Sequence, residues 1–378
     1  MKIVYLTYEN SEDIKAWSGT ISFIANYLEK GNELVRVDKL KKPIDNLFRL
    51  LSKLFTLFGF TSDYRRNKLF ISLVTKRVEK RLENIEYDVL FSPGTLYVSR
   101  LDIYKPIVVW VDATFSSLLD TYPQYSKLTN KQIKAGNELE DSAFERISKV
   151  IFSTSWAANS AINSYQLNKN KVEIIPFGSN LENNFQQKDI QLFNRSKSDD
   201  KIKLLFIGAD WDKKGGDLLL SIFSELKQLS NRYELDIVGS SPDNAPEMDD
   251  IIFHGFLNKS NSSQNQKLNS LFQSSHYFIL PTKAEAFGIV FCEANSYGLP
   301  VFGSNIGGIP DIIKNGVNGE LLEIHNTPKQ LASRIHSFVR SGDYNEKSLR
   351  AYNHYRDNFT WEKSIARVNE VLKWTVQE

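Results

Sequence analysis

The chain of 378 residues has a single cysteine, Cys292, so it can form neither an internal disulfide nor a cysteine-based zinc site. Its five histidines lack the paired spacing of zinc ligands, which argues against a structural metal. No apolar run approaches the roughly eighteen residues of a membrane-spanning helix. Residues 1–14 hold only a short apolar stretch and then turn acidic, which is typical of a first strand rather than a secretion signal. We therefore expect a protein of the reducing cytoplasm.

The amino-acid composition, with 41% hydrophobic and 24% charged residues, is typical of a soluble globular protein. A chain of this length is too long for one ordinary core, so we expect two domains. The formal net charge of +2 conceals an asymmetry. Residues 39–81 carry twelve Lys/Arg against three Asp/Glu, a balance of +9, which leaves −7 for the rest of the chain.

Strand, loop and helix patterns alternate twice along the chain. The first half opens with a β-rich run at residues 2–8, a helical apolar pattern at 21–28 and a second strand at 34–37. Further strands are predicted at 87–91, 106–111, 150–153, 172–175, 204–207, 235–238, 277–280, 301–302 and 319–323. This alternation predicts an α/β fold of two Rossmann-like, doubly wound domains with mainly parallel sheets.

The polar segment 183–201 has few apolar residues and is interpreted as the domain boundary. We place the first domain at residues 1–185 and the second at 186–360. A last helix follows Thr360, a plausible N-cap, and it carries an apolar stripe. This helix, residues 361–378, is able to pack on either domain.

The most specific pattern lies where a buried strand is followed by a helix. Glu285 and Glu293 stand there, separated by seven residues. Glu285 falls at the carboxyl end of the strand, where open α/β sheets bind ligands, and carboxylates bind sugar or ribose hydroxyls. The amides of Gly288, Ile289 and Val290 fall at the helix N-terminus and suit a phosphate. The alternative is two surface glutamates flanking an amphipathic helix.

A second strand-to-helix loop begins at Gly208 and contains Lys213 and Lys214 followed by two glycines. The lysines are placed to meet a diphosphate, and glycines let the backbone approach it closely. The alternative is a solvated turn with two exposed lysines. The segment Asp210-Trp211-Asp212 mimics a metal-binding motif, a resemblance that we interpret as accidental.

Three further loops carry weaker signals. Gly307 and Gly308 precede a helix and permit a tight turn close to an anion, although a simple turn explains each glycine equally well. Asp112 stands at the tip of the strand 106–111, either as a site carboxylate or as a cap of the segment that follows. Gly19 lies in the first loop of the chain.

Together these residues resemble the retaining glycosyltransferase family 4, which has the GT-B fold. Glu285 and Glu293 match its E-x7-E signature, and residues 307–311 are similar to its GG-I-P-E loop with Asp in place of Glu. Residues 214–217 resemble its K-G-x-D loop. Weaker matches lie at 17–20, 153–156 and 175–178. The resemblance spans nearly the whole chain, but its specific motifs lie in the second half.

The resemblance implies two domains that face a central cleft. The second domain would bind a nucleotide sugar and the first an acceptor, with helix 361–378 crossing back to the first. The implied activity is transfer of a hexose-type sugar from UDP-, GDP- or another nucleotide sugar to a glycan or lipid-linked acceptor, with retention and without a cofactor or metal. Such an enzyme belongs in polysaccharide biosynthesis.

Site roles follow from the same resemblance. Glu293 would hold the ribose, Glu285 the transferred sugar, and Lys214 the diphosphate, with help from the amides of Ile289 and Val290. The family usually has Arg where this chain has Ala209, so we expect Lys213 to supply the second cation. It often has His near position 112, where Asp112 stands here as the candidate catalytic group. The alternatives are a sugar-nucleotide epimerase of similar fold and a non-catalytic sugar-nucleotide-binding scaffold.

The basic segment 39–81 contains an apolar stretch with one narrow polar stripe on a helix, formed by Asp45, Arg49, Ser52 and Thr56. Its apolar members are Leu47, Phe48, Leu50, Leu51, Leu54, Phe55, Leu57, Phe58 and Phe60. We favour a core helix for most of these side chains. The alternative is a surface that meets anionic lipid, which would make the protein peripheral on the cytoplasmic membrane face. Its field would also gather an anionic polysaccharide or a lipid-linked diphosphate acceptor. No nucleic-acid-binding module is recognisable.

Overall fold

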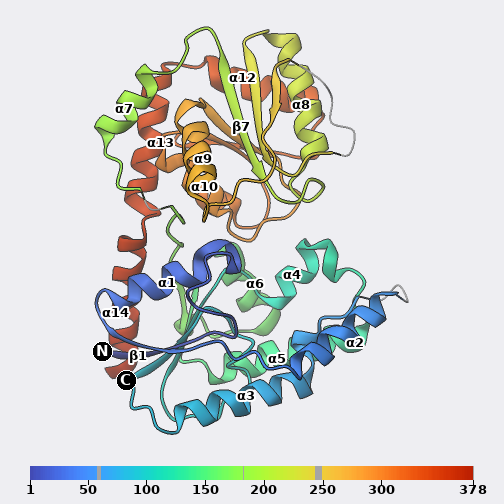
Figure 1. Cartoon of the computed structure of the whole chain (residues 1–378), viewed down its shortest axis with the longest axis vertical. Coiled ribbons are helices and arrows are strands. Elements are labelled where there is room, and N and C mark those ends of the chain that lie inside the picture. The colour runs from blue at the N-terminus through green and yellow to red at the C-terminus, as the bar shows by residue number, and fades with distance from the viewer. Residues whose placement is uncertain (58–60, 182, 243–248, 378) are drawn as a thin grey trace. The chain divides into compact units, whose positions relative to one another are not determined.

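The computed structural model describes residues 1–57, 61–181, 183–242 and 249–377 (Figure 1). They form two compact units, one of Met1–Phe177 with Trp361–Glu378 and one of Gly178–Thr360. Each unit contains a six-stranded sheet in which all paired strands are parallel, with helices around it. The unit boundary lies at 177/178, whereas the sequence interpretation places it at 185/186.

The sheet of the first unit has the strand order β2-β1-β3-β4-β5-β6, so the order reverses at β1. Its strands are β1 (Lys2–Leu6), β2 (Glu33–Val37), β3 (Val89–Ser92), β4 (Ile107–Val111), β5 (Lys149–Phe152) and β6 (Val172–Ile174). Its helices are α1 (Thr20–Glu29), α2 (Asp45–Leu57), α3 (Lys68–Leu82), α4 (Phe115–Thr121), α5 (Asn130–Arg146), α6 (Ser155–Tyr165) and α14 (Trp361–Gln377). Strands β3, β4 and β5 are buried along their whole length, because helices cover both faces of the sheet.

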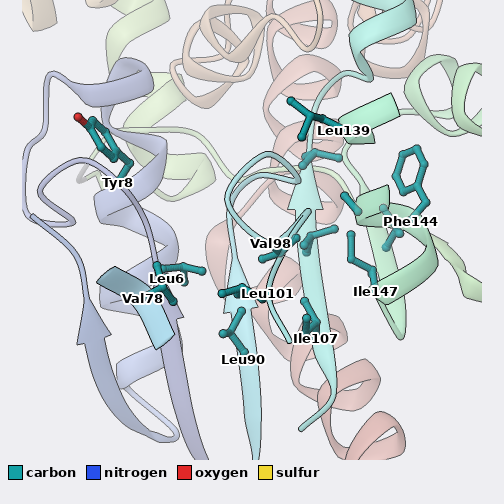
Figure 2. Close-up of a cluster of buried hydrophobic side chains, with 14 of the residues drawn as sticks. Leu6, Tyr8, Val78, Leu90, Val98, Leu101, Ile107, Leu139, Phe144 and Ile147 are labelled. Carbon is teal, nitrogen blue, oxygen red and sulfur yellow. The ribbon is translucent and has the colours of Figure 1, made fainter. Parts of the chain in front are cut away.

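One face of this sheet packs against α3, α5 and α6, and Figure 2 shows part of the resulting core, with Leu90 of β3 next to Leu101. The other face packs against α1 and α14. The Trp361 ring lies 5.8 Å from the ring of Trp110 on β4 and 5.9 Å from that of Phe23 on α1. The closing helix therefore completes the core of the first unit.

The sheet of the second unit has the order β12-β11-β10-β7-β8-β9. Its strands are β7 (Ile202–Gly208), β8 (Tyr233–Gly239), β9 (Ile251–Phe253), β10 (Tyr277–Leu280), β11 (Val301–Ser304) and β12 (Gly319–Leu322). Its helices are α7 (Gln187–Arg195), α8 (Gly216–Leu229), α9 (Ser262–Ser274), α10 (Ile289–Ser296), α11 (Ile309–Ile312), α12 (Pro328–Arg340) and α13 (Tyr344–Asn358). From β7 the chain continues to β8, which lies on one side of β7 in the sheet. After β9 it returns to β10, which lies on the opposite side of β7. This reversal makes the gap between β7 and β10 the topological switch point, where open α/β sheets bind ligands.

Two segments of the second unit differ from the sequence interpretation. Strand β9 was not predicted, because three residues with Ile252 exposed carry little pattern. The segment 183–201 is not a simple linker, since it contains α7, which packs against α13 and α9 with Ile190 fully buried. A short helix needs only one narrow apolar side to pack against its neighbours. The average composition of residues 183–201 is therefore polar although the segment contains a helix.

Helix α2 buries a polar residue and exposes most of its apolar residues, although Phe48 packs against the core as the core-helix interpretation expects. Its polar residue Asp45 is 2% exposed, and its carboxylate accepts hydrogen bonds from both terminal guanidinium nitrogens of Arg77 (2.7 and 2.8 Å), from the Tyr8 hydroxyl (2.8 Å) and from the Lys42 amide (2.8 Å). Burial by itself raises the pKa of Asp45, but these hydrogen bonds outweigh it and hold the pKa below its ordinary value. Asp45 therefore anchors α2 to the protein, together with the half-buried Ser52, whose hydroxyl donates to the Ser62 carbonyl, whereas Arg49 of the same stripe is exposed.

The apolar side of α2 faces outward instead. Leu47, Leu50, Leu54 and Leu57, spaced at i, i+3, i+7 and i+10, are all exposed, and we call them the outer stripe. The core-helix interpretation is therefore wrong for these side chains. Phe58 and Phe60 lie outside the described residues. Among the described residues, no helix is long and apolar enough to cross a membrane.

Candidate functional site

The loops that follow β7 and β10 leave neighbouring strands at the switch point of the second sheet and lead into α8 and α10. Each helix is preceded by a glycine in the left-handed region, Gly215 with φ 75° and Gly288 with φ 90°. At Gly215 a Cβ atom would lie 1.9 Å from the Pro281 carbonyl oxygen, so only glycine fits. The Lys213 carbonyl accepts hydrogen bonds from the Lys283 amide (2.8 Å) and the Thr282 hydroxyl (3.0 Å). The two loops are thus packed backbone against backbone.

This packing brings together the lysine and the glutamate that the sequence places in different motifs. Lys214 Nζ lies 2.5 Å from Glu285 Oε2, with 20% and 15% of the two side chains exposed. A Cβ atom on Gly208, at the end of β7, would lie 3.0 Å from the Lys214 side chain, so this glycine makes room for the lysine stem. The ion pair therefore presents a cation and a carboxylate at the carboxyl edge of the sheet.

The double-glycine loop after β11 supports Glu285 from its other side. Gly307 has φ 54°, and a Cβ atom there would lie 1.9 Å from the Glu285 carbonyl oxygen. The Gly308 amide donates to the same oxygen at 3.3 Å. This loop therefore contacts the backbone of Glu285 directly, which a simple isolated turn would not do.

Glu293 lies in the second turn of α10 and is only 4% exposed. Its Oε1 lies 2.6 Å from Nζ of Lys259, which comes from the loop after β9. Lys259 was not predicted as a site residue, because the strand that precedes it, β9, was not predicted. The sequence signal that could have found Lys259 is its position a few residues after a strand. Loops after parallel strands emerge at the same edge of the sheet, where the other site loops lie.

The N-terminus of α10 has the features expected of an anion site. Its N-cap is Gly288, and no side chain caps the helix. The first-turn amides of Ile289 and Val290 therefore keep their capacity to donate to a ligand. They lie in the same loop-to-helix segment as Glu285, four and five residues further along the chain.

The carboxylates of Asp210-Trp211-Asp212 serve separate partners. Asp210 Oδ1 accepts a hydrogen bond from the Lys213 amide at 3.0 Å, and Asp212 pairs with Lys283 at 2.5 Å. The intervening Trp211 donates its Nε1–H to Asp217 at 2.8 Å. These contacts hold the loop in shape, and they direct the two carboxylates to different neighbours.

In the first unit, Asp112 lies just after β4, and its Oδ2 accepts a hydrogen bond from Trp17 Nε1 at 3.2 Å. The loop that carries Trp17 is tightly turned, with Trp17, Ser18 and Gly19 all at positive φ. Asp112 does not cap the next helix, because Thr114 caps α4 through a capping box with Ser117. The capping hypothesis for Asp112 is therefore wrong, and its carboxylate and the Gly19 loop belong to one cluster.

The chain belongs to the family of group 1 glycosyl transferases, whose family model matches residues 167–355, half of its length. Among curated proteins it is similar to a D-inositol 3-phosphate glycosyltransferase of Thermobifida fusca, with 23% identity over 239 residues that cover 60% of this chain and 55% of the relative. The chain thus spans about half the length of the curated relatives it matches.

Solved structures share the fold over almost the entire chain. Sucrose-phosphate synthase from Thermosynechococcus elongatus aligns with a TM-score of 0.72 at 13% identity, covering 99% of this chain and 98% of that one. Anabaena Alr3699/HepE, solved in complex with UDP and glucose, aligns with a TM-score of 0.63 at 16% identity, covering 99% of each chain. The predicted fold class, two Rossmann-like α/β units of the GT-B type, is confirmed.

Proposed function

We propose that this protein transfers a hexose-type sugar from a nucleoside diphosphate sugar to a glycan or lipid-linked acceptor, with retention of the anomeric configuration and without a metal ion. The observation that carries the proposal is the Lys214–Glu285 ion pair at the switch point. Retention follows from the resemblance to the retaining family 4. A UDP-sugar is the first donor to try, because the similar Anabaena protein was solved with UDP and glucose.

In the proposed reaction, departure of the nucleoside diphosphate builds negative charge on the diphosphate and positive charge on the sugar. Lys214 and the amides of Ile289 and Val290 stabilise the leaving diphosphate, and this stabilisation grows toward the transition state. Lys213 serves as the second cation. Because fixed positive groups of the protein meet this charge, the step needs no metal.

The carboxylates have different tasks. Glu285 accepts hydrogen bonds from hydroxyls of the transferred sugar, and Glu293 accepts them from the ribose. Lys259 holds the carboxylate of the buried Glu293 in one orientation until the ribose arrives. In the acceptor-binding unit, we assign a catalytic role to Asp112 and a donor contact to Gly19, whose left-handed backbone lets a ligand approach closely.

A donor-hydrolysis assay tests the proposal, after a thermal-shift screen of nucleotide sugars has found the donor that stabilises the protein. We expect slow release of nucleoside diphosphate and free sugar, unchanged by EDTA, and NMR during the first turnovers should show the released sugar as the same anomer as in the donor. A stabilising donor that is never cleaved would favour the non-catalytic scaffold, and an epimerised donor would favour the epimerase. Activity lost in EDTA and restored by Mg²⁺ or Mn²⁺ would exclude the metal-free version.

We also propose that the surface formed by residues 39–81 meets an anionic membrane, which would make the protein peripheral on the cytoplasmic face. Five of the twelve basic residues in this segment form ion pairs with carboxylates, namely Lys39, Arg65, Arg66, Lys68 and Arg77. The others include Lys53 on α2, next to the exposed outer stripe. Apolar side chains flanked by cations favour an anionic lipid surface, with about 1 kcal/mol for each basic residue near it.

Sedimentation with vesicles tests this surface. Wild type should pellet with phosphatidylglycerol vesicles at low salt, much less at high salt, and little with phosphatidylcholine vesicles. The double variant Leu50→Asp/Leu54→Asp should bind at least roughly tenfold more weakly, because two apolar contacts are lost and two negative charges are added. Leu192→Asp, which changes an exposed leucine of α7 in the second unit, is the matched control. Equal and negligible binding of wild type to both vesicle types at low salt would refute the membrane surface.

A further inference from the structure

A second apolar row of α2 lines a cavity of about 580 Å³. Phe48, Leu51 and Phe55, at i, i+3 and i+7, form this row, which we call the inner row. Leu51 and Phe55 are exposed like the outer stripe, so the cavity is open to solvent along the inner row. Across the cavity lie Leu128, just before α5, and Phe115, the first residue of α4. The volume falls within the range of about 300–1,000 Å³ that is typical of small-molecule sites.

The cavity is lined by apolar side chains together with four cations and two carboxylates, so its lining has a net positive charge; the carboxylates, Asp63 and Glu138, pair with Arg66 and Lys68. Lys131 and Lys134 on α5 contribute to its wall, are exposed, and form no ion pair within the described part of the chain. Arg66 also lines it, paired with Asp63 and with its guanidinium 4.3 Å from the Phe115 ring centre. The Arg66 Nε is buried and finds no hydrogen-bond partner among the described residues. That nitrogen is inaccessible from the cavity, so Arg66 contributes to this wall through the 16% of its side chain that is exposed.

The position of the cavity links it to the acceptor side of the proposed reaction. Phe115 follows β4 and stands three residues after Asp112, at the carboxyl edge of the first sheet. Ligands of open α/β sheets bind along that edge. The outer stripe on the same helix is available to contact lipid while the inner row contacts a ligand, because the two rows occupy different sides of α2.

We propose that this cavity binds the hydrocarbon chain of an anionic lipid-linked acceptor, with the acceptor's phosphate held by Lys131, Lys134 and Arg66. The inference rests on the proposed function, whose acceptor it specifies as a lipid phosphate. Apolar walls select the chain, and the cations select the phosphate. An uncharged lipid lacks the phosphate that the cations bind, and a free phosphate lacks the hydrocarbon chain that the apolar walls bind.

Calorimetric titration with alkyl phosphates below their micelle concentrations tests the site, with hexyl, octyl and decyl phosphate as probes. Affinity should rise by up to about fourfold for each CH₂ group that enters the cavity. Octyl phosphate should bind more tightly than either octanol or inorganic phosphate. Affinity that does not change with chain length, or that equals that of inorganic phosphate, would overturn the proposal.

Three variants separate the parts of the site. Ala135→Phe places a large side chain of α5 in the cavity and should abolish the dependence of affinity on chain length. If this variant does not fold, Leu51→Asp, at an exposed position of the inner row, tests the apolar wall of the cavity instead. Lys131→Gln/Lys134→Gln should remove the preference for octyl phosphate over octanol. Unchanged titrations in both cavity variants, or in the double lysine variant, would place the ligand elsewhere.

Two comparisons distinguish this inference from the other proposals. Leu50→Asp/Leu54→Asp should still bind octyl phosphate, whereas Ala135→Phe should still pellet with phosphatidylglycerol vesicles. Loss of vesicle binding in Ala135→Phe would assign the cavity to bulk membrane lipid and overturn the acceptor assignment. Donor hydrolysis without acceptor should be unaffected by the cavity variants. Its absence in wild type would refute sugar transfer while leaving the alkyl phosphate titrations intact.

Discussion

Replacing Lys214 with alanine should lower kcat by roughly 10²–10³-fold, the loss expected when one preorganised donor to a developing charge is removed. This lysine lies 2.5 Å from Glu285, so it is held at the carboxyl edge of β7. The effect should appear in kcat more than in KM, because the diphosphate gains charge as the sugar departs. Steady-state kinetics with the donor found by thermal shift measure both constants.

Lys227→Ala is the matched control for this variant. Lys227 lies on α8 of the same unit and forms an ion pair of similar burial with Asp250 at 2.6 Å, away from the loops of the site. Its removal should lower stability but leave kcat nearly unchanged. Lys213→Ala should also lower kcat, because Ala209 provides no cation in the same loop. Normal turnover in both single variants and in their double variant would refute the diphosphate assignment.

Replacing Glu293 with alanine should weaken binding of the free nucleoside diphosphate by roughly 10- to 100-fold, as expected for a lost charge-assisted hydrogen bond. A ribose contact exists in the ground state and in the transition state alike, so the loss should appear in Kd. Glu285→Ala should instead lower kcat. Its nucleoside diphosphate affinity should be maintained or increased, because Lys214 no longer has a carboxylate partner. Calorimetry with the nucleoside diphosphate distinguishes the two variants.

Glu320→Ala serves as the control for both acids. Glu320 is a partly buried glutamate on β12 that pairs with Arg334 at 2.6 Å. This variant should bind the nucleoside diphosphate like wild type. If Glu293→Ala also binds it like wild type, the ribose role of Glu293 is wrong, whatever its effect on turnover.

Much of the fold was predictable because its signals are local. Buried parallel strands such as β4 are continuous apolar runs, and each is bounded by loop residues, so their positions follow from the sequence to within a few residues. Strand β9 and helix α7 were missed for the converse reason. A strand of three residues and a helix with one fully buried apolar side chain, Ile190, have too little local pattern to stand out.

Parts of the site were also visible in the sequence. Glu285 and Lys214 lie in loops that follow buried strands, Glu293 lies in the helix after one of these loops, and residues that follow parallel strands gather at one edge of a sheet. The pairing of Glu293 with Lys259 was not visible. It depends on how β9 is placed relative to α10, two elements that are far apart along the chain.

The sequence by itself determined the two α/β units, the loops that carry the candidate donor site and the amphipathic character of α2, because strand and helix periodicity are properties of neighbouring residues. Only the tertiary structure decided which side of α2 faces the protein. The buried Asp45, held by Arg77 and Tyr8, points inward, while the outer stripe is exposed and the inner row lines a cavity. Helical periodicity defines a polar side and an apolar side, but the direction each faces depends on partners brought close by the fold.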